Sequence, residues 1–309
     1  METLTARDGA ARAPALPAPG SPGAWILAAR PRTLPAALAP VAVGTAIAAV
    51  EGGARALPAL AAACGALLLQ IGANFANDVF DAERGADGEA RIGPPRAVQQ
   101  GLLSPRAVRR GMAAVFGAAL APGLYLAAIG GWPIVALGAA SIAAAVAYTG
   151  GPWPLGYHGL GEVAVFLFFG LAAVCGTSYV QTLAVSPAAL AASLPIGALA
   201  SAILVVNNLR DVETDALAGK RTLAVRLGRR GARLEYLALV ATAFAACPLL
   251  ALALESPGPL LAWLSAPLAQ GPLRSVFQRS DGPALNAALA ESARLELAFA
   301  LLLALGIAL

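Results

Sequence analysis

Charged side chains are scarce in this sequence. They make up 12% of the 309 residues, whereas 59% are hydrophobic. Several apolar runs approach the roughly 20 residues that a membrane-spanning helix needs. Segments in which apolar and polar residues alternate, as in the strands of an outer-membrane barrel, are absent. The composition therefore predicts an all-α integral membrane protein whose helices pack in lipid.

Cysteine is also rare, and it forms no recognisable metal or disulfide pattern. Cys64, Cys175 and Cys247 each fall inside an apolar run, without a close partner or metal-ligand spacing. We expect all three to be small buried hydrophobic residues. The net charge of +4 does not indicate nucleic-acid binding, because the basic residues lie in loops between apolar runs, where they act as topology signals.

The apolar runs predict about nine membrane helices. They lie near 34–50, 57–76, 111–130, 132–149, 162–184, 188–208, 233–254, 257–273 and 285–309. Residues 24–309 are therefore expected to form one transmembrane domain. Residues 1–23, rich in Ala, Pro and Gly, predict a disordered cytoplasmic tail and not a cleaved signal peptide. Trp25 to Arg32 is expected to be a short interfacial helix.

Arginine and lysine fix the predicted orientation. If nine helices alternate, nearly all loop cations fall on one side, and only Arg55 falls clearly on the other. The cations of the first side are Arg7, Arg12, Arg30, Arg32, Arg84, Arg91, Arg96, Arg106, Arg109, Arg110, Arg210, Lys220, Arg221, Arg226, Arg229, Arg230, Arg233, Arg274 and Arg279. The positive-inside rule then places the N-terminus in the cytoplasm of a cell whose plasma (inner) membrane holds the protein, and the C-terminus outside.

Two polar stretches end apolar runs on the predicted cytoplasmic side. The first is Asn74-Phe75-Ala76-Asn77-Asp78-Val79-Phe80-Asp81, and the second is Asn207-Asn208-Leu209-Arg210-Asp211-Val212-Glu213-Thr214-Asp215. Each carries two aspartates spaced three or four apart, which places both carboxylates on one face of a helix. Four such charges in a half-buried pocket repel one another unless a cation joins them.

The aspartates and the cations that follow them predict a diphosphate site. Mg²⁺ is usually held by one or two carboxylates together with phosphate oxygens. Arg84, Arg91, Lys220 and Arg221 lie just downstream, where they can meet phosphate oxygens directly. With an apolar bundle behind the site, the residues indicate an enzyme that acts on a lipid diphosphate. Helix capping by the aspartates and topology signalling by the cations are the alternatives.

The loop from Tyr148 to Glu162 is the third informative stretch. It is rich in turn residues, contains no lysine or arginine, and carries Tyr157, Trp153 and the only histidine of the chain, His158. These side chains predict a wall for a flat aromatic ligand or a reactive cation. An aromatic belt at the membrane interface is the alternative. Glu162 is either a functional acid or a helix cap, and His158 either a general base or a loop hydrogen-bond partner.

The stretch Asn77-Asp78-Val79-Phe80-Asp81, with Asp211 to Asp215, resembles the paired aspartate motifs of the UbiA superfamily of intramembrane prenyltransferases. Gly93 to Gly101, Tyr148 to Glu162 and Asn207 to Gly228 further resemble the branch that acts on 1,4-dihydroxy-2-naphthoate in menaquinone synthesis. The resemblance extends from about residue 25 to 309. Asp87, six residues after Asp81, stands for a third aspartate that superfamily members often carry closer.

This resemblance implies a nine-helix bundle with a central cavity capped by cytoplasmic loops. Its substrates would be a polyprenyl diphosphate and 1,4-dihydroxy-2-naphthoate, with diphosphate and CO₂ released. The resemblance implies Mg²⁺ bound by Asp78, Asp81, Asp211, Asp215 and Asp87. It implies diphosphate binding by Asn77, Arg84, Arg91, Asn208, Lys220 and Arg221, and acceptor binding by Arg96, Tyr148, Trp153, Tyr157, His158 and Asn74.

Three alternatives to the naphthoate prenyltransferase remain open at this stage. A related prenyltransferase would act on homogentisate, 4-hydroxybenzoate or haem. A cation transporter would use the same acidic clusters, although it would place them near the membrane midplane. A structural membrane scaffold would leave the aspartate pairs unexplained. The sequence carries no signal for oligomeric state or prenyl chain length.

Overall fold

The computed structural model describes residues 16–86, 88 and 92–309, and within them every regular element is a helix. The elements are α1 (Pro22–Ala29), a 3₁₀ turn (Pro31–Thr33), α2 (Leu34–Val50), α3 (Ala56–Glu83), α4 (Pro105–Gly130), α5 (Trp132–Ala147), a 3₁₀ turn (Leu155–His158), α6 (Gly161–Val165), a π-helical segment (Phe166–Ala172), α7 (Ala173–Thr182), α8 (Pro187–Arg210), α9 (Val212–Leu217), α10 (Leu223–Ala253), a 3₁₀ segment (Gly258–Ser265), α11 (Ala266–Gln278) and α12 (Gly282–Ala308). The expected all-α class is confirmed.

Capping residues in the sequence explain where several helices begin. Ser104, Ser186 and Asp281 each precede a helix and accept a hydrogen bond from the backbone N–H three residues later. Such side chains satisfy one of the free N–H groups at a helix start. Proline occupies the first turn of each of these helices, where its missing N–H costs nothing.

The described helices form a multi-pass membrane bundle. Six helical stretches in this part of the chain are long and apolar enough to cross a membrane. They are Pro22–Val50, Ala56–Glu83, Pro105–Gly130, Gly161–Thr182, Pro187–Arg210 and Leu223–Ala253. Of these, α8 is the most enclosed, with 72% of its apolar window buried. A Cβ on Gly170 would lie 2.8 Å from the Gly197 Cα, so glycine lets the π-helical segment pack directly against α8.

Several boundaries differ from the sequence-based expectation, and α4 begins six residues early, at Pro105. Helix α3 does not end near residue 76 but continues to Glu83, so the first aspartate motif lies within its last turns. Helix α10 begins ten residues before the expected residue 233, at Leu223, and Gly228 breaks its backbone with a φ of 69°. The expected helix at 257–273 is a 3₁₀ segment followed by α11, because prolines crowd its start.

The cysteine prediction holds for two of the three residues. Cys175 and Cys247 are buried, but Cys64 is exposed. Cys64 lies on α3, where only 11% of the apolar window is buried within the protein. The prediction was wrong for Cys64 because the outer face of a membrane helix is covered by lipid and not by protein.

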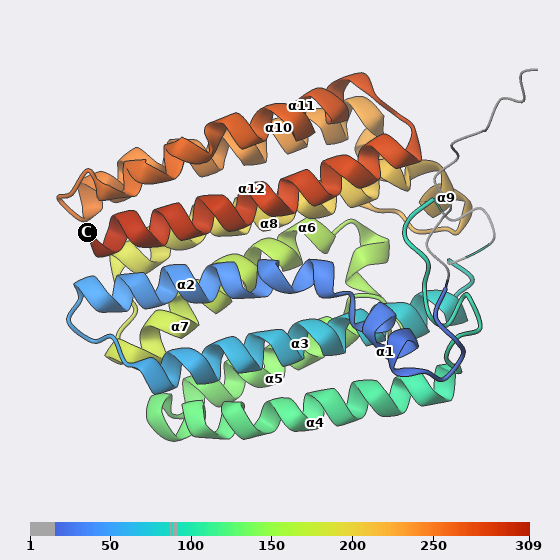
Figure 1. Ribbon diagram of the computed structural model, residues 1–309, viewed down its shortest axis with the longest axis horizontal. Coiled ribbons are helices and arrows are strands. Elements are labelled where there is room, and N and C mark those ends of the chain that lie inside the picture. The colour runs from blue at the N-terminus through green and yellow to red at the C-terminus, as the bar shows by residue number, and fades with distance from the viewer. Residues whose placement is uncertain (1–15, 87, 89–91) are drawn as a thin grey trace, which may run out of the picture.

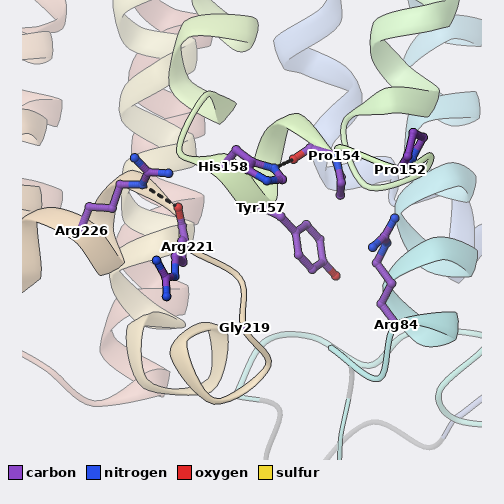
Figure 2. A pocket seen from close by; sticks show the side chains of 8 residues that line it. All are labelled: Arg84, Pro152, Pro154, Tyr157, His158, Gly219, Arg221 and Arg226. Carbon is purple, nitrogen blue, oxygen red and sulfur yellow. Dashed lines mark hydrogen bonds between the residues drawn. The ribbon is translucent and has the colours of Figure 1, made fainter.

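The connections that carry the sequence motifs gather at one end of the bundle. Figure 1 shows α1, α9 and the segment before α4 at this end, with the C-terminus at the opposite end. The α5–α6 connection reaches the same region, since the Tyr157 carbonyl accepts a hydrogen bond from the Arg221 N–H. Figure 2 shows this connection with its prolines, Tyr157 and His158. Residues 16–21 also return here, because the Gly20 N–H donates to the Leu102 carbonyl.

Candidate functional site

The first aspartate motif occupies one face of α3. Asn74, Asn77, Asp78 and Asp81 follow the i, i+3, i+4, i+7 spacing that places side chains in one stripe. Asn74, Asp78 and Asp81 are buried. Such burial of carboxylates at a helix end is costly unless charge or hydrogen bonds compensate it. The expectation that the spacing puts both carboxylates on one helical face is confirmed.

The loop after α3 folds back onto these carboxylates. Asp78 accepts hydrogen bonds from the backbone N–H groups of Ala97 and Val98, at 3.2 and 3.3 Å. Arg96, the preceding residue, forms an ion pair with Asp81 at 3.2 Å. Asp78 therefore binds the backbone of the loop, and Asp81 binds the charged side chain of Arg96 in the same loop. Arg96, for which the sequence implied acceptor binding, lies at the aspartates.

The second motif lies at a break between two helices. Asp211 ends α8, with non-helical backbone angles, and α9 begins at the next residue. One turn is nevertheless kept, since the Asp215 N–H donates to the Asp211 carbonyl at 2.7 Å. The two carboxylates are thus one turn apart, but they do not share a continuous helix.

Arg210 is a central residue of this motif, and sequence analysis treated it only as a topology signal. Its side chain is 2% exposed and makes an ion pair with Asp211. It also donates to the side-chain carbonyls of Asn207 and Asn286, at 2.9 and 2.8 Å. The sequence feature that could have indicated this role is an arginine in the last turn of a very apolar helix, directly before an aspartate. A charge at such a depth needs partners.

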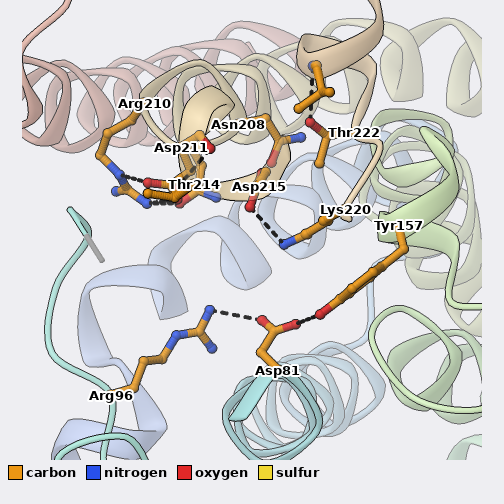
Figure 3. A network of polar contacts seen from close by, with 12 residues as sticks. Asp81, Arg96, Tyr157, Asn208, Arg210, Asp211, Thr214, Asp215, Lys220 and Thr222 are labelled. Atoms are coloured by element: carbon orange, nitrogen blue, oxygen red, sulfur yellow. Dashed lines mark hydrogen bonds and ion pairs between the residues drawn. The ribbon is translucent and has the colours of Figure 1, made fainter. Parts of the chain in front are cut away.

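The two motifs face each other. Figure 3 shows Asp81, with Arg96 and Tyr157, pointing toward the group formed by Asp215 and Lys220. The Lys220 Nζ lies 3.8 Å from the Asp215 Oδ1. Burial raises the pKa of Asp215 to about 6; Lys220 opposes the rise, and the negative charges of Asp211 and Asp81 add to it. The carboxylates of both motifs therefore act electrostatically on one another.

One carboxylate oxygen where the two motifs meet lacks a hydrogen-bond partner among the described residues. Among the described residues, no three acidic, histidine or cysteine side chains are gathered closely enough to hold a metal ion alone. The Asp215 Oδ2 is buried and has no hydrogen-bond partner in this part of the chain. A buried carboxylate oxygen without a partner, close to other carboxylates, is suited to binding a cation. Such a cation can also bind the oxygens of an anionic ligand.

Comparison with known proteins identifies the family of the chain. The model of the UbiA prenyltransferase family matches residues 37–307. The chain belongs to this family. It is 46% identical over 254 residues to the 1,4-dihydroxy-2-naphthoate octaprenyltransferase of Mycobacterium tuberculosis, covering 81% of this chain and 86% of that protein.

Two further comparisons support the whole-length match. The chain is 38% identical over 291 residues to the 1,4-dihydroxy-2-naphthoate octaprenyltransferase of Escherichia coli, covering 92% of this chain and 94% of that protein. A solved UbiA homolog from Archaeoglobus fulgidus, bound to GPP and Mg²⁺, shares the fold with a TM-score of 0.61 at 16% identity, covering 90% of this chain and 98% of that one.

In this UbiA-family chain, Tyr157 joins the aspartates to the α5–α6 connection. Its hydroxyl donates to Asp81 at 3.0 Å. Its ring lies 5.3 Å from the Arg84 guanidinium and 5.4 Å from the Lys220 ammonium, within cation–π range. Lys220 is thus positioned by both Asp215 and Tyr157. The sequence identified Tyr157 as a wall residue, and the structure adds its hydrogen bond to Asp81.

An asparagine from each motif reaches the same connection. Asn77 accepts a hydrogen bond from the Thr149 hydroxyl at 3.1 Å. Asn208 donates to the Glu162 carboxylate at 2.7 Å. Thr149 and Glu162 are near the two ends of the connection, so the asparagines hold it between the motifs. Glu162 is buried, which a solvent-facing cap would not be.

The remaining predicted site residues are distributed over several surroundings. Asn74 donates to the Ala29 carbonyl and the Thr33 hydroxyl, and so ties α3 to the N-terminal segment. Trp153 and His158 stack at 4.3 Å, and His158 Nδ1 lies 2.9 Å from the Pro154 carbonyl. Asp87 and Arg91 lie outside the described residues.

Proposed function

We propose that the protein transfers a polyprenyl group from a polyprenyl diphosphate to 1,4-dihydroxy-2-naphthoate, releasing diphosphate and CO₂, in menaquinone biosynthesis. The observation that carries this proposal is the meeting of two aspartate motifs, each with its own cation, at the loop end of a membrane bundle. The relatives from M. tuberculosis and E. coli, whose names specify this acceptor, support the choice within the family.

Divalent metal, which we take to be Mg²⁺, fits the residues present. The candidate ligands are Asp78, Asp81, Asp211 and Asp215; the buried Asp215 Oδ2 has no hydrogen-bond partner among the described residues, whereas both oxygens of Asp78 accept hydrogen bonds from backbone N–H groups. Carboxylates shared with phosphate oxygens are the usual surroundings of Mg²⁺ in such enzymes. When bound, the metal supplies charge neutralisation to the diphosphate as it leaves. The A. fulgidus homolog bound to GPP and Mg²⁺ supports the same assignment.

The chain's own cations bind and orient the diphosphate. Arg96 and Lys220 each neutralise a candidate ligand, Asp81 and Asp215 respectively. When metal and diphosphate enter together, these two side chains can turn from carboxylate to phosphate oxygens. Arg210 stays on Asp211, because its burial and its bonds to two asparagines fix it. Preorganised positive charge at the leaving group lowers the barrier to ionisation of the allylic C–O bond.

Aromatic faces next to the aspartates shield the reacting carbon. Tyr157 is held beside the aspartates by its hydrogen bond to Asp81, whereas Phe75, six residues before Asp81 on α3, packs against Trp25. Such faces stabilise an allylic cation and exclude water from it. The acceptor ring then captures the cation, and its carboxylate leaves as CO₂.

Nine membrane passes complete this proposal. They are α2, α3, α4, α5, the α6–α7 stretch with its π-helical segment, α8, α10, the 3₁₀ segment with α11, and α12. With a cytoplasmic N-terminus, nine passes place the aspartates on the cytoplasmic side and the C-terminus outside. This agrees with the distribution of basic residues. The loops at that end cap a central cavity.

A competition assay tests the function. Membranes containing the protein are incubated with one polyprenyl diphosphate and equal amounts of 1,4-dihydroxy-2-naphthoate and 4-hydroxybenzoate, and the products are identified by mass spectrometry. We expect a prenylated naphthalene product that has lost the carboxylate. Equal use of both acceptors, or a product that keeps its carboxylate, would overturn the naphthoate assignment.

A further inference from the structure

A cavity of about 400 Å³ lies beside the aspartates, in the cytoplasmic end of the bundle as proposed above. Figure 2 shows its lining, which comes from the end of α3, the α5–α6 connection, the α9–α10 connection and the start of α10. The lining residues are Arg84, Pro152, Pro154, Tyr157, His158, Gly219, Arg221 and Arg226. The volume is in the range of small-molecule sites, about 300–1,000 Å³.

The cavity is positively charged. Arg84, Arg221 and Arg226 line it, and no carboxylate is among the described residues that do so. Arg84 donates to the carbonyls of Thr149 and Gly151, and Arg226 to that of Arg221, so their bonds within the described chain are to neutral groups. Three uncompensated guanidinium groups around one recess favour an anion.

The rest of the lining is flat and partly apolar. The Tyr157 ring, two prolines and His158, which is stacked on Trp153, supply these surfaces. Gly159 has a φ of +73°, and a Cβ there would lie 3.0 Å from the Arg226 Nε, so glycine lets the arginine close onto the connection. Guanidinium groups bind carboxylates bidentately and the flat faces can pack on a ring, so the lining suits an aromatic carboxylate.

The position excludes the prenyl chain. Every lining residue belongs to a connection or a helix end at the loop end of the bundle. A long apolar tail placed there would lie in water, which is unfavourable. The occupant is therefore a water-soluble anion, and Tyr157, whose hydroxyl bonds Asp81, gives this cavity a shared wall with the aspartate site.

We propose that this cavity is the docking site of the aromatic carboxylate acceptor, with Arg221 and Arg226 binding the carboxylate and the Tyr157–His158 region contacting the ring. The proposal rests on the proposed function for the acceptor class. It gives Arg226 a role that sequence analysis did not assign, and it moves Arg84 and Arg221 from the diphosphate to the acceptor.

Steady-state kinetics of Arg226→Gln against Arg230→Gln test the proposal. Both variants remove one positive charge from exposed positions of α10, but Arg230 does not line the cavity. We expect Arg226→Gln to raise the KM for 1,4-dihydroxy-2-naphthoate about tenfold, equivalent to about 1.4 kcal/mol, with the KM for prenyl diphosphate changed less than twofold. Arg230→Gln should leave both values unchanged.

A binding assay separates this proposal from the proposed function. The probe is 1-hydroxy-2-naphthoate, followed by quenching of Trp153 fluorescence in the full chain, with Trp153→Phe removing the signal. Binding should weaken about tenfold in Arg226→Gln and resist competition by inorganic diphosphate. Displacement by diphosphate, or a rise only in the KM for prenyl diphosphate, would overturn the proposal. Tight, Arg226-dependent binding without naphthoate turnover would sustain the docking site while refuting the proposed function.

Discussion

The two aspartate motifs differ more in structure than in sequence. The first lies on the uninterrupted last turns of α3, where a loop folds back and supplies both backbone N–H groups and Arg96. The second lies at a break between α8 and α9, where Arg210 from the same segment neutralises Asp211. The first motif is therefore completed by a loop that folds back onto it, whereas the second motif is completed by a residue of its own segment.

The largest expected effect comes from removing one carboxylate charge in either motif. We expect Asp81→Asn and Asp215→Asn each to lower kcat by about 10²- to 10³-fold, because each removes charge that holds metal and diphosphate at the reacting centre. The measurement is turnover in detergent-purified protein, with thermal unfolding to show that the bundle remains folded.

Each motif offers a matched control for these variants. Glu83 and Glu213 are exposed carboxylates paired with Arg109 and Arg229 at the surface. Exposed pairs contribute less than about 1 kcal/mol, so Glu83→Gln and Glu213→Gln should leave kcat within about twofold. If Asp81→Asn retained activity like that of Glu83→Gln, the first motif would not take part in the reaction.

The next effect distinguishes the motifs by stability. Arg210→Met leaves Asp211 buried without its cation, and loss of one partner of a buried pair costs about 3–5 kcal/mol. Arg84→Met, next to the first motif, removes bonds from an exposed guanidinium to carbonyls and should cost less than about 2 kcal/mol. Thermal and denaturant unfolding in mild detergent measure both.

A double variant separates charge from packing in this comparison. If the loss in Arg210→Met comes from the unpaired carboxylate, Arg210→Met combined with Asp211→Leu should recover part of the stability. Equal destabilisation by the double and single variants would instead assign the loss to packing around Arg210.

The sequence predicted those features that depend on local periodicity. Apolar runs located the helices, and the three- and four-residue spacings located the carboxylates on one face or one turn apart. The roles of the arginines depend on the folded chain. Arg84 lies three residues after Asp81 yet bonds Thr149, whereas Arg96 lies fifteen residues after Asp81 and pairs with it. No local pattern distinguishes these two arginines.

The asparagines provide a finer test of the same comparison. Asn208→Ala deprives the buried Glu162 carboxylate of its donor and should cost about 1.5–3 kcal/mol, as hydrogen bonds to charged groups do. Asn77→Ala removes a neutral bond to Thr149 and should cost about 0.5–1.5 kcal/mol. Thermal unfolding of the two variants gives the ranking, and the reverse order would contradict the view that Asn208 serves Glu162.

The smallest expected effect concerns metal binding in the absence of diphosphate. Lys220 and Arg96 lie 3.8 and 3.2 Å from Asp215 and Asp81, so each competes with a divalent cation for a carboxylate. Both pairs are largely buried, so removing the cation leaves a carboxylate that favours another positive charge. Lys220→Gln should therefore bind Mn²⁺ alone about fivefold more tightly, equivalent to about 1 kcal/mol, as measured by electron paramagnetic resonance. With diphosphate present the order should reverse, because the same ammonium then binds phosphate oxygens.

Arg96→Gln should change Mn²⁺ binding in the same way as Lys220→Gln if both motifs release their cations when metal and diphosphate enter. Tighter Mn²⁺ binding in one variant only would show that a single motif releases its cation when metal and diphosphate enter, and unchanged binding in both would contradict the exchange.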